Sequence, residues 1–166
     1  MSDQDDFELS SFTPFLLNQA AEAQSLVFSS IYRNRYGMLR TEWRVLFHLG
    51  RHTALTAKQI SDLASIHKTK VSRAVRALEE KRFLEREAAE SDRRLEILRL
   101  RPAGRDAFNY LVGAARDYET ALAARLGSDR VRMLKDLLEA LHSGAAVHPD
   151  MIDGVNSETD RAARDV

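Results

Sequence analysis

Apolar residues recur at three- and four-residue spacing in six stretches of the chain, a pattern that predicts six helices. The first helix starts at Thr13-Pro14, a Thr N-cap followed by Pro, and ends near Gly37. The others are expected over about 41–51, 56–65, 68–81, 101–126 and 129–142. The runs FLER and LEILRL read as two short strands around the loop EAAESDRR. We therefore expect a mainly α protein with a small two- or three-stranded hairpin.

The third and fourth helices are the most sharply defined part of this pattern. Thr56 and Gln59 form a capping box, and Leu55 and Ile60 are spaced as the hydrophobic staple around it. A very short turn follows. The fourth helix then carries a single apolar stripe, formed by Val71, Ala74, Val75 and Leu78. A short capped helix, a tight turn and a second helix make a helix-turn-helix, and the hairpin behind it makes the winged version.

The residues turned away from that stripe suit contact with DNA. At about 100° per residue, Thr69, Ser72, Arg73 and Arg76 face outward. An α-helix fits the major groove of B-DNA, where hydroxyls reach bases or phosphates and Arg pairs with guanine. The predicted DNA-contacting residues of this recognition helix are His67, Lys68, Thr69, Lys70, Ser72, Arg73 and Arg76.

The loop between the strands has two interpretations. Asp92, Arg93 and Arg94 crowd its tip. As a solvated turn, they form a surface ion pair worth about 0–1 kcal/mol. As the tip of a wing, an Arg enters the neighbouring minor groove of DNA, and Asp92 holds that Arg in one pose. The position of the loop directly behind the helix-turn-helix favours the second interpretation.

Together these residues resemble the MarR-type family of winged helix-turn-helix transcriptional regulators. The matching pieces, in chain order, are LRTEWRVLFHL, LTAKQISDLA, HKTKVSRAVRALEEKRFLER, ESDRRLEILRL and RPAGRDAF. The Asp-x-Arg that is characteristic of the family's wing falls on Asp92 and Arg94. The resemblance implies a DNA-binding domain over residues 38–100 and a helical dimerisation region over 13–37 and 101–143.

The resemblance also implies how such a protein acts. Family members are homodimers on pseudo-palindromic double-stranded DNA, and usually repressors that a small aromatic or phenolic acid releases. It places the effector pocket near Tyr36, Arg40, Trp43 and Phe47. The alternative for these residues is ordinary packing of the aromatic rings and a surface charge at Arg40. A second alternative concerns the whole domain, because winged helices also serve as protein–protein interaction modules without specific DNA binding.

This sequence departs from the family pattern at Arg82, where a Gly normally precedes the first wing strand. A left-handed backbone at a residue other than Gly costs roughly 1 kcal/mol. The helix could instead end one residue differently, which would tilt the wing. The redox-sensing branch of the family needs a cysteine, and the chain has none.

The distribution of charge supports an anionic partner for the middle of the chain. The formal net charge is zero, yet residues 67–105 hold twelve Lys or Arg against seven Asp or Glu. The flanks are correspondingly acidic. Residues 1–12 are expected to be a disordered N-terminus and 144–166 a flexible tail, because both are polar and aperiodic.

Several other functions are disfavoured by the sequence. Without cysteine there are no disulfides and no thiolate metal sites, and the pair His48 and His52 lacks further ligands at recognisable spacing. No phosphate-cradling Gly loop, nucleophile elbow or paired metal motif indicates an enzyme or a cofactor. No apolar stretch is long enough to span a membrane, and the acidic start is not a secretion signal. We expect a cytoplasmic protein without metal or cofactor.

Overall fold

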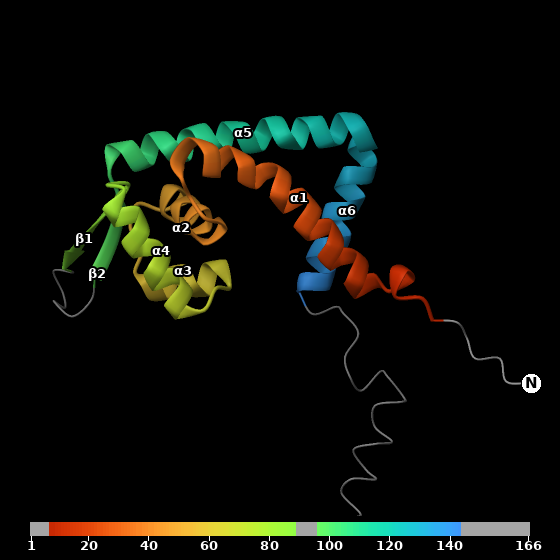
Figure 1. Ribbon diagram of the computed structural model, residues 1–166, viewed down its shortest axis with the longest axis horizontal. Helices are drawn as coiled ribbons and strands as arrows, with labels where there is room; N and C mark the ends of the chain where they lie inside the picture. Colours follow the sequence, from red (N-terminus) through yellow and green to blue (C-terminus); the bar gives the residue numbers. More distant parts are fainter. Residues whose placement is uncertain (1–6, 89–95, 144–166) are drawn as a thin grey trace, which may run out of the picture. The chain divides into compact units, whose positions relative to one another are not determined.

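The computed structural model describes residues 7–88 and 96–143, which contain six α-helices and two strands (Figure 1). The elements are α1 (Thr13–Tyr36), α2 (Arg40–Arg51), α3 (Ala57–Ala64), α4 (Lys68–Glu80), β1 (Leu84–Ala88), β2 (Glu96–Leu100), α5 (Pro102–Leu126) and α6 (Ser128–His142). The chain up to Tyr118 forms one compact unit, and the end of α5 with α6 belongs to a second. The expected fold class is confirmed.

The first helix begins slightly differently from the prediction. Thr13 is its first residue, and the N-cap is Phe12, whose side chain makes no capping hydrogen bond. Just before it, Leu9–Ser11 form one turn of 3-10 helix, within the stretch 1–12 for which the sequence predicts disorder. The turn is closed by backbone hydrogen bonds such as that from the Phe12 N–H to the Leu9 carbonyl, 3.1 Å long. Residues 1–6 and 144–166 lie outside the described residues.

The predicted capping box is present at the start of α3. The Gln59 N–H donates to Thr56 Oγ1 at 3.2 Å, and the Thr56 N–H donates to Gln59 Oε1 at 2.8 Å. Leu55 and Ile60 are both buried, as the staple requires. Leu55 also forms an isolated antiparallel bridge with Leu98 of β2, so the capping segment ties α3 to the hairpin.

The turn between α3 and α4 is held by three polar contacts. Ser65 adopts the left-handed conformation with φ 49°, and the Ser61 hydroxyl donates to the Ile66 carbonyl at 2.6 Å. From α2, the Arg44 guanidinium donates to the Ala64 carbonyl. His67 then caps α4. These contacts satisfy backbone groups that the helix ends leave free, and they fix the angle at which α4 leaves the turn.

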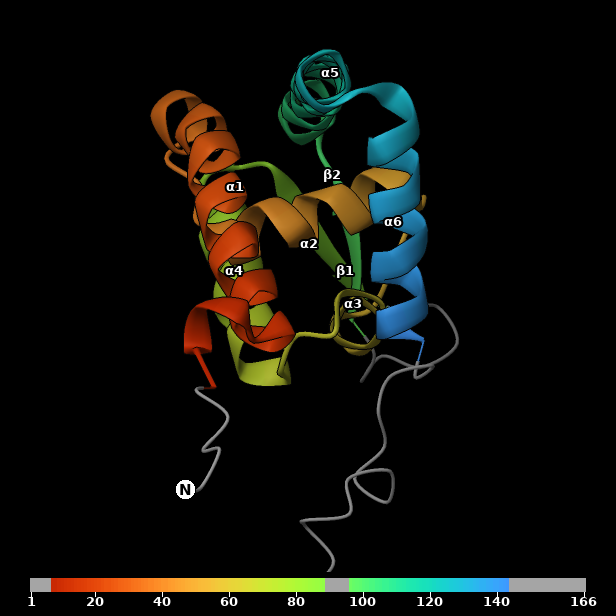
Figure 2. The same cartoon turned by 90° about the vertical axis from the view of Figure 1, so that its right-hand side faces the viewer.

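The core of the first unit lies between α2, α3, α4 and the hairpin, which pack on one another (Figure 2). The side chains with less than 2% exposure include Leu46, Leu49, Ile60, Val71, Val75, Leu78, Leu84, Leu98 and Leu111. The α4 stripe predicted from the sequence is therefore buried as a whole. Burial of aliphatic side chains of this size stabilises the fold by about 1.5–3 kcal/mol each.

Two glycines allow α5 to approach this core closely. A Cβ on Gly104 would lie 1.9 Å from the Phe83 carbonyl oxygen, and one on Gly50 would lie 2.1 Å from the Phe108 ring. The Arg105 guanidinium donates to the Gly50 carbonyl at 2.6 Å, which serves the C-terminal end of α2. The start of α5 is thus locked against both α2 and the segment before β1.

The hairpin is antiparallel, with Leu84 opposite Leu100 and Ala88 opposite Glu96. Its exposed side chains form cross-strand ion pairs, Arg99 with Glu87 at 3.1 Å and Arg101 with Glu85 at 3.0 Å. On the other face, Arg86 bonds both Glu96 and Glu79 of α4 at 2.9 Å. These pairs hold the base of the wing against α4.

No helix in the described ranges 7–88 and 96–143 is long and apolar enough to cross a membrane.

The structure resolves the question raised by Arg82. Its φ is 60°, so the residue is left-handed. The Phe83 N–H donates to the Leu78 carbonyl at 2.9 Å and the Arg82 N–H to the Glu79 carbonyl at 2.8 Å. This is the Schellman pattern, in which the left-handed residue is usually Gly. Here Arg82 takes the strained position, and the helix ends where a Gly would have ended it.

We expect the backbone strain at Arg82 to be measurable by comparing two substitutions. Arg82→Gly removes both the side chain and the strain, whereas Arg82→Ala removes only the side chain. The Gly variant should exceed the Ala variant in free energy of unfolding by about 1 kcal/mol, because only Ala retains the left-handed penalty. Urea denaturation provides the measurement. Equal stabilities would contradict the assignment of strain to this residue.

Candidate nucleic-acid interface

The outward face of α4 is exposed along its whole length, in contrast to its buried stripe. All seven residues predicted for it are exposed in the structure, namely His67, Lys68, Thr69, Lys70, Ser72, Arg73 and Arg76. They come together on one side of one helix because Val71, Ala74, Val75 and Leu78 take the other side. The face carries four basic side chains and two hydroxyl groups, and no large apolar side chain.

The basic side chains of this face differ in their partners. Arg76 Nε lies 3.0 Å from Glu80 Oε1, with 78% and 65% of the two side chains exposed. An exposed pair of this kind contributes little and is readily exchanged for another partner. Lys68, Lys70 and Arg73 form no ion pair within the described ranges. Their charge is available to an anion from outside the chain.

His67 has a defined tautomer at the start of this face. The Thr69 N–H donates to His67 Nδ1 at 3.4 Å, so the neutral ring carries its proton on Nε2. That N–H is a hydrogen-bond donor on an exposed side chain. The histidine therefore serves as the helix cap with one nitrogen and presents a donor with the other.

The predicted wing tip, Asp92, Arg93 and Arg94, lies outside the described residues, and its contacts remain a prediction. The structure does describe the two strands that lead to it. Arg86 anchors these strands to Glu79 of α4.

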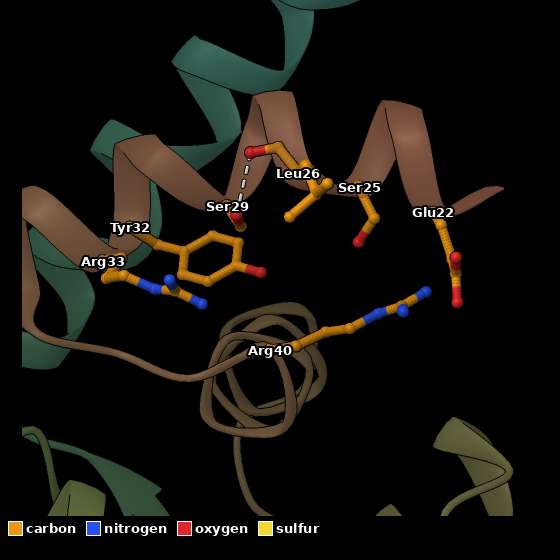
Figure 3. A pocket seen from close by; sticks show the side chains of 7 residues that line it. All are labelled: Glu22, Ser25, Leu26, Ser29, Tyr32, Arg33 and Arg40. Atoms are coloured by element: carbon orange, nitrogen blue, oxygen red, sulfur yellow. Dashed lines mark hydrogen bonds between the residues drawn. The ribbon is translucent and has the colours of Figure 1, made fainter. Parts of the chain in front are cut away.

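A pocket of about 340 Å³ lies between α1 and the first residue of α2 (Figure 3). Arg33 lies beside the Tyr32 ring, and Arg40 reaches toward Ser25 and Glu22. Neither Arg33 nor Arg40 forms an ion pair within the described ranges. The lining joins two guanidinium groups, hydroxyls and the edge of an aromatic ring to one carboxylate, that of Glu22. One positive charge is therefore in excess, which suits a small aromatic anion.

The four residues predicted for an effector pocket are not brought together. Only Arg40 lines the pocket. Trp43 and Phe47 pack edge to face, with 5.5 Å between ring centroids, in an aromatic cluster beneath it. Tyr36 packs elsewhere, against Phe83 at 5.9 Å and Tyr110 at 6.0 Å.

Sequence reasoning missed the α1 side of this pocket. Ser25, Ser29 and Arg33 recur at four-residue spacing along the first helix, and the sequence analysis assigned none of them to a site. This row of polar residues was the available signal. Ser29 is buried even though it is polar, and its hydroxyl donates to the Leu26 carbonyl at 2.8 Å.

The histidine pair of α2 shows an electrostatic effect rather than a ligand set. Burial lowers the pKa of His48, and the charges of Arg44 and His52 lower it further. A metal site would require more ligands, and the part of the chain that the structure describes contains no group of three or more His, Cys, Asp or Glu.

Comparisons with known proteins agree with this geometry. Residues 36–95 match the model of the MarR family. Over 103 residues the chain is 28% identical to YwaE, an uncharacterized HTH-type transcriptional regulator of Bacillus subtilis, and the match covers 62% of this chain and 60% of that protein. The chain thus matches about three fifths of the length of this relative.

Solved structures extend the similarity beyond the winged helix. A MarR family transcriptional regulator of Silicibacter pomeroyi is 27% identical, with a TM-score of 0.66, and the match covers 80% of this chain and 99% of that one. NadR in complex with 4-hydroxyphenylacetate is 23% identical, with a TM-score of 0.64, and the match covers 85% of this chain and 97% of that one. The second similarity is one of fold.

We expect the low pKa of His48 to make stability depend on pH in a defined direction. The unfolded chain binds a proton at His48 more readily than the folded one, so the contribution of His48 to stability is complete above about pH 6.5 and declines as the pH falls below it. His48→Gln removes the titration. The loss of unfolding free energy between about pH 7.5 and 5.5 should be smaller in the variant than in the wild type. An equal or larger loss would rule out this role.

Proposed function

Because the chain is a MarR-type winged helix-turn-helix protein, we propose that it is a sequence-specific, DNA-binding transcriptional regulator. The observation that carries the proposal is the outward face of α4, where Lys68, Lys70 and Arg73 are exposed and unpaired within the described ranges. Its family is one of transcriptional regulators, not of enzymes.

In this proposal α4 enters the major groove. Arg73 and Arg76 lie one turn apart on the exposed face and reach base edges, while Lys68, Thr69 and Lys70 meet phosphates near the helix start. Asp92, Arg93 and Arg94 serve as the wing, with an Arg in the adjacent minor groove. In this proposal the protein acts on DNA in the cytoplasm.

A winged helix that docks a protein is the alternative function. Protein interfaces are centred on buried apolar or aromatic anchors. The outward face of α4 carries cations and hydroxyls instead, which favours DNA as the partner.

We further propose that the regulator is a homodimer. The second unit exposes an apolar face on α6, formed by Met133, Leu134, Leu137, Leu138 and Leu141. A monomer rarely leaves such a continuous patch in water, and a second copy of the chain would cover it. In this arrangement residues 13–37 and 101–143 form the dimerisation region and 38–100 the DNA-binding domain. Two recognition helices then read a pseudo-palindromic operator with half-sites about one helical turn apart.

A small aromatic or phenolic acid is the proposed effector, and repression the proposed mode of regulation. The pocket of Arg33 and Arg40 supports this ligand class, because two guanidinium groups and the edge of Tyr32 complement a ring that carries a carboxylate. The NadR structure holds 4-hydroxyphenylacetate, an acid of this class. Release follows if the ligand favours a spacing of the two winged domains that does not fit the operator.

The first experiment is fluorescence anisotropy on DNA from immediately upstream of the protein's own gene, with a scrambled duplex of equal length as reference. We expect operator binding to be tighter than binding to the scrambled duplex by roughly a thousandfold or more. Arg73→Ala should weaken operator binding by about 1–3 kcal/mol and relax base preference, because it removes a bidentate contact with a base.

Arg51→Ala is the matched control for Arg73→Ala. It removes the same charge from an exposed residue at the far end of α2, and it should leave operator binding nearly unchanged. Equal and weak binding of the wild-type protein to both duplexes would favour the protein-docking alternative.

The proposed dimer is tested by sedimentation velocity. The wild-type protein should sediment with about twice the chain mass of 18.8 kDa. Leu137→Asp should shift it toward the monomer, since a symmetric interface would bury two unpaired carboxylates. Arg132→Asp, outside the apolar face of α6, is the control that should stay dimeric. A monomeric wild-type protein would end the dimer proposal.

A further inference from the structure

A second hollow, of about 360 Å³, lies between the start of α2, the α3–α4 turn and the first turn of α4. We call it the basic hollow. Its polar lining consists of Arg40, Thr41, Arg44, Ser65, His67 and Lys70. Three of these side chains carry permanent positive charge, and no carboxylate is among the residues that line the hollow.

Two of the three cations that line the basic hollow, Arg40 and Lys70, form no ion pair within the described ranges. Glu42 lines the neighbouring pocket, but it is buried, and Lys81 Nζ lies 3.1 Å from its Oε2. Glu42 Oε2 forms no hydrogen bond within the described part of the chain, so its interaction with Lys81 is a charge interaction only. Glu42 is the one acid among the residues that line this neighbouring pocket, and it already has its counter-charge. Glu22 lines the α1–α2 pocket toward which Arg40 reaches, but the two side chains do not form an ion pair.

The basic hollow is held in shape by the fold. Arg44 is fixed by its hydrogen bond to the Ala64 carbonyl, and a planar guanidinium retains further N–H donors. His67 is fixed by the Thr69 N–H, which leaves its Nε2–H as a donor. The hollow also lies at the start of α4, where the helix dipole adds partial positive charge. No carboxylate lines the hollow to accept from these donors.

We propose that the basic hollow binds one phosphate group of the DNA backbone. The inference rests on the proposed DNA-binding function and adds α2, through Arg40 and Arg44, to the DNA interface. His67 and Lys70 belong both to the hollow and to the outward face of α4, so DNA lying along that face passes over the hollow. Contacts of Lys, Arg and helix starts with phosphates fix the register of a protein on the duplex and carry no base preference.

The test compares two arginines with different surroundings. Arg40→Gln removes a charge from the basic hollow, whereas Arg33→Gln removes one from the α1–α2 pocket alone. Operator affinity is measured by anisotropy across a salt series. For Arg40→Gln the slope of log affinity against log salt should become shallower by about 0.9 for each occupied hollow, and affinity near 150 mM salt should fall roughly tenfold. The slope for Arg33→Gln should remain that of the wild type.

Duplexes with one neutral methylphosphonate at successive positions then locate the phosphate. For the wild-type protein, one position in each half-site should lower affinity. For Arg40→Gln the same position should have little further effect, because the two changes remove the same contact. Arg40→Lys retains the charge and should restore sensitivity at that position. Thermal unfolding of each variant verifies that the fold is intact.

The outcomes separate this inference from the proposed function. Tight operator binding by the wild type with an unchanged slope for Arg40→Gln would overturn the inference and leave the regulator proposal standing. Equal reductions in slope for Arg40→Gln and Arg33→Gln would also overturn it, because they would indicate long-range charge rather than a site. Failure to discriminate operator from scrambled DNA would contradict the regulator proposal, whereas a slope change specific to Arg40→Gln would still support a phosphate site.

Discussion

Burial of the apolar stripe of α4 is the constraint on which the rest of the structure depends. Val71, Ala74, Val75 and Leu78 can leave water only if the helix turns that side toward α2 and α3. Since the helix is a rigid cylinder, its cations and hydroxyls then face outward as a group. The hydrophobic effect thus positions the polar face, although none of the polar residues contributes to that driving force.

The wing depends on this constraint through backbone contacts as well as through side chains. The Schellman end of α4 at Arg82 directs the chain into β1. The Phe83 carbonyl lies so close to Gly104 that a residue with a Cβ would not fit there without a shift of the backbone. Arg86 ties the hairpin to Glu79 on the same helix. The direction of the hairpin is therefore set by the end of α4, at the cost of one strained residue.

Arg40 lies where two parts of the molecule meet. It lines both the pocket beneath α1 and the basic hollow at the start of α4. One guanidinium group cannot pair fully with an anion in each of them. If both proposed sites bind anions, occupation of one lowers the affinity of the other, and this coupling is reciprocal by thermodynamic necessity. Because Arg40 is shared by the two proposed sites, a ligand could affect DNA binding through this one residue, without a series of rearrangements between distant parts of the molecule.

The sequence by itself determined the helices, the capping box at Thr56 and the exposed face of α4, because spacing and cap chemistry are local properties. At Arg82 the resemblance left two alternatives open, a strained left-handed residue or a shifted helix end, and the structure decided for the first. Only the tertiary structure decided which residues share a pocket. Tyr36 and Trp43 are near in sequence, yet one packs on Phe83 and the other joins the cluster under α1. The pocket around Arg40 is formed where helices pack on one another. Helix packing depends on the relative placement of the helices, which the spacing of apolar residues within one helix does not determine.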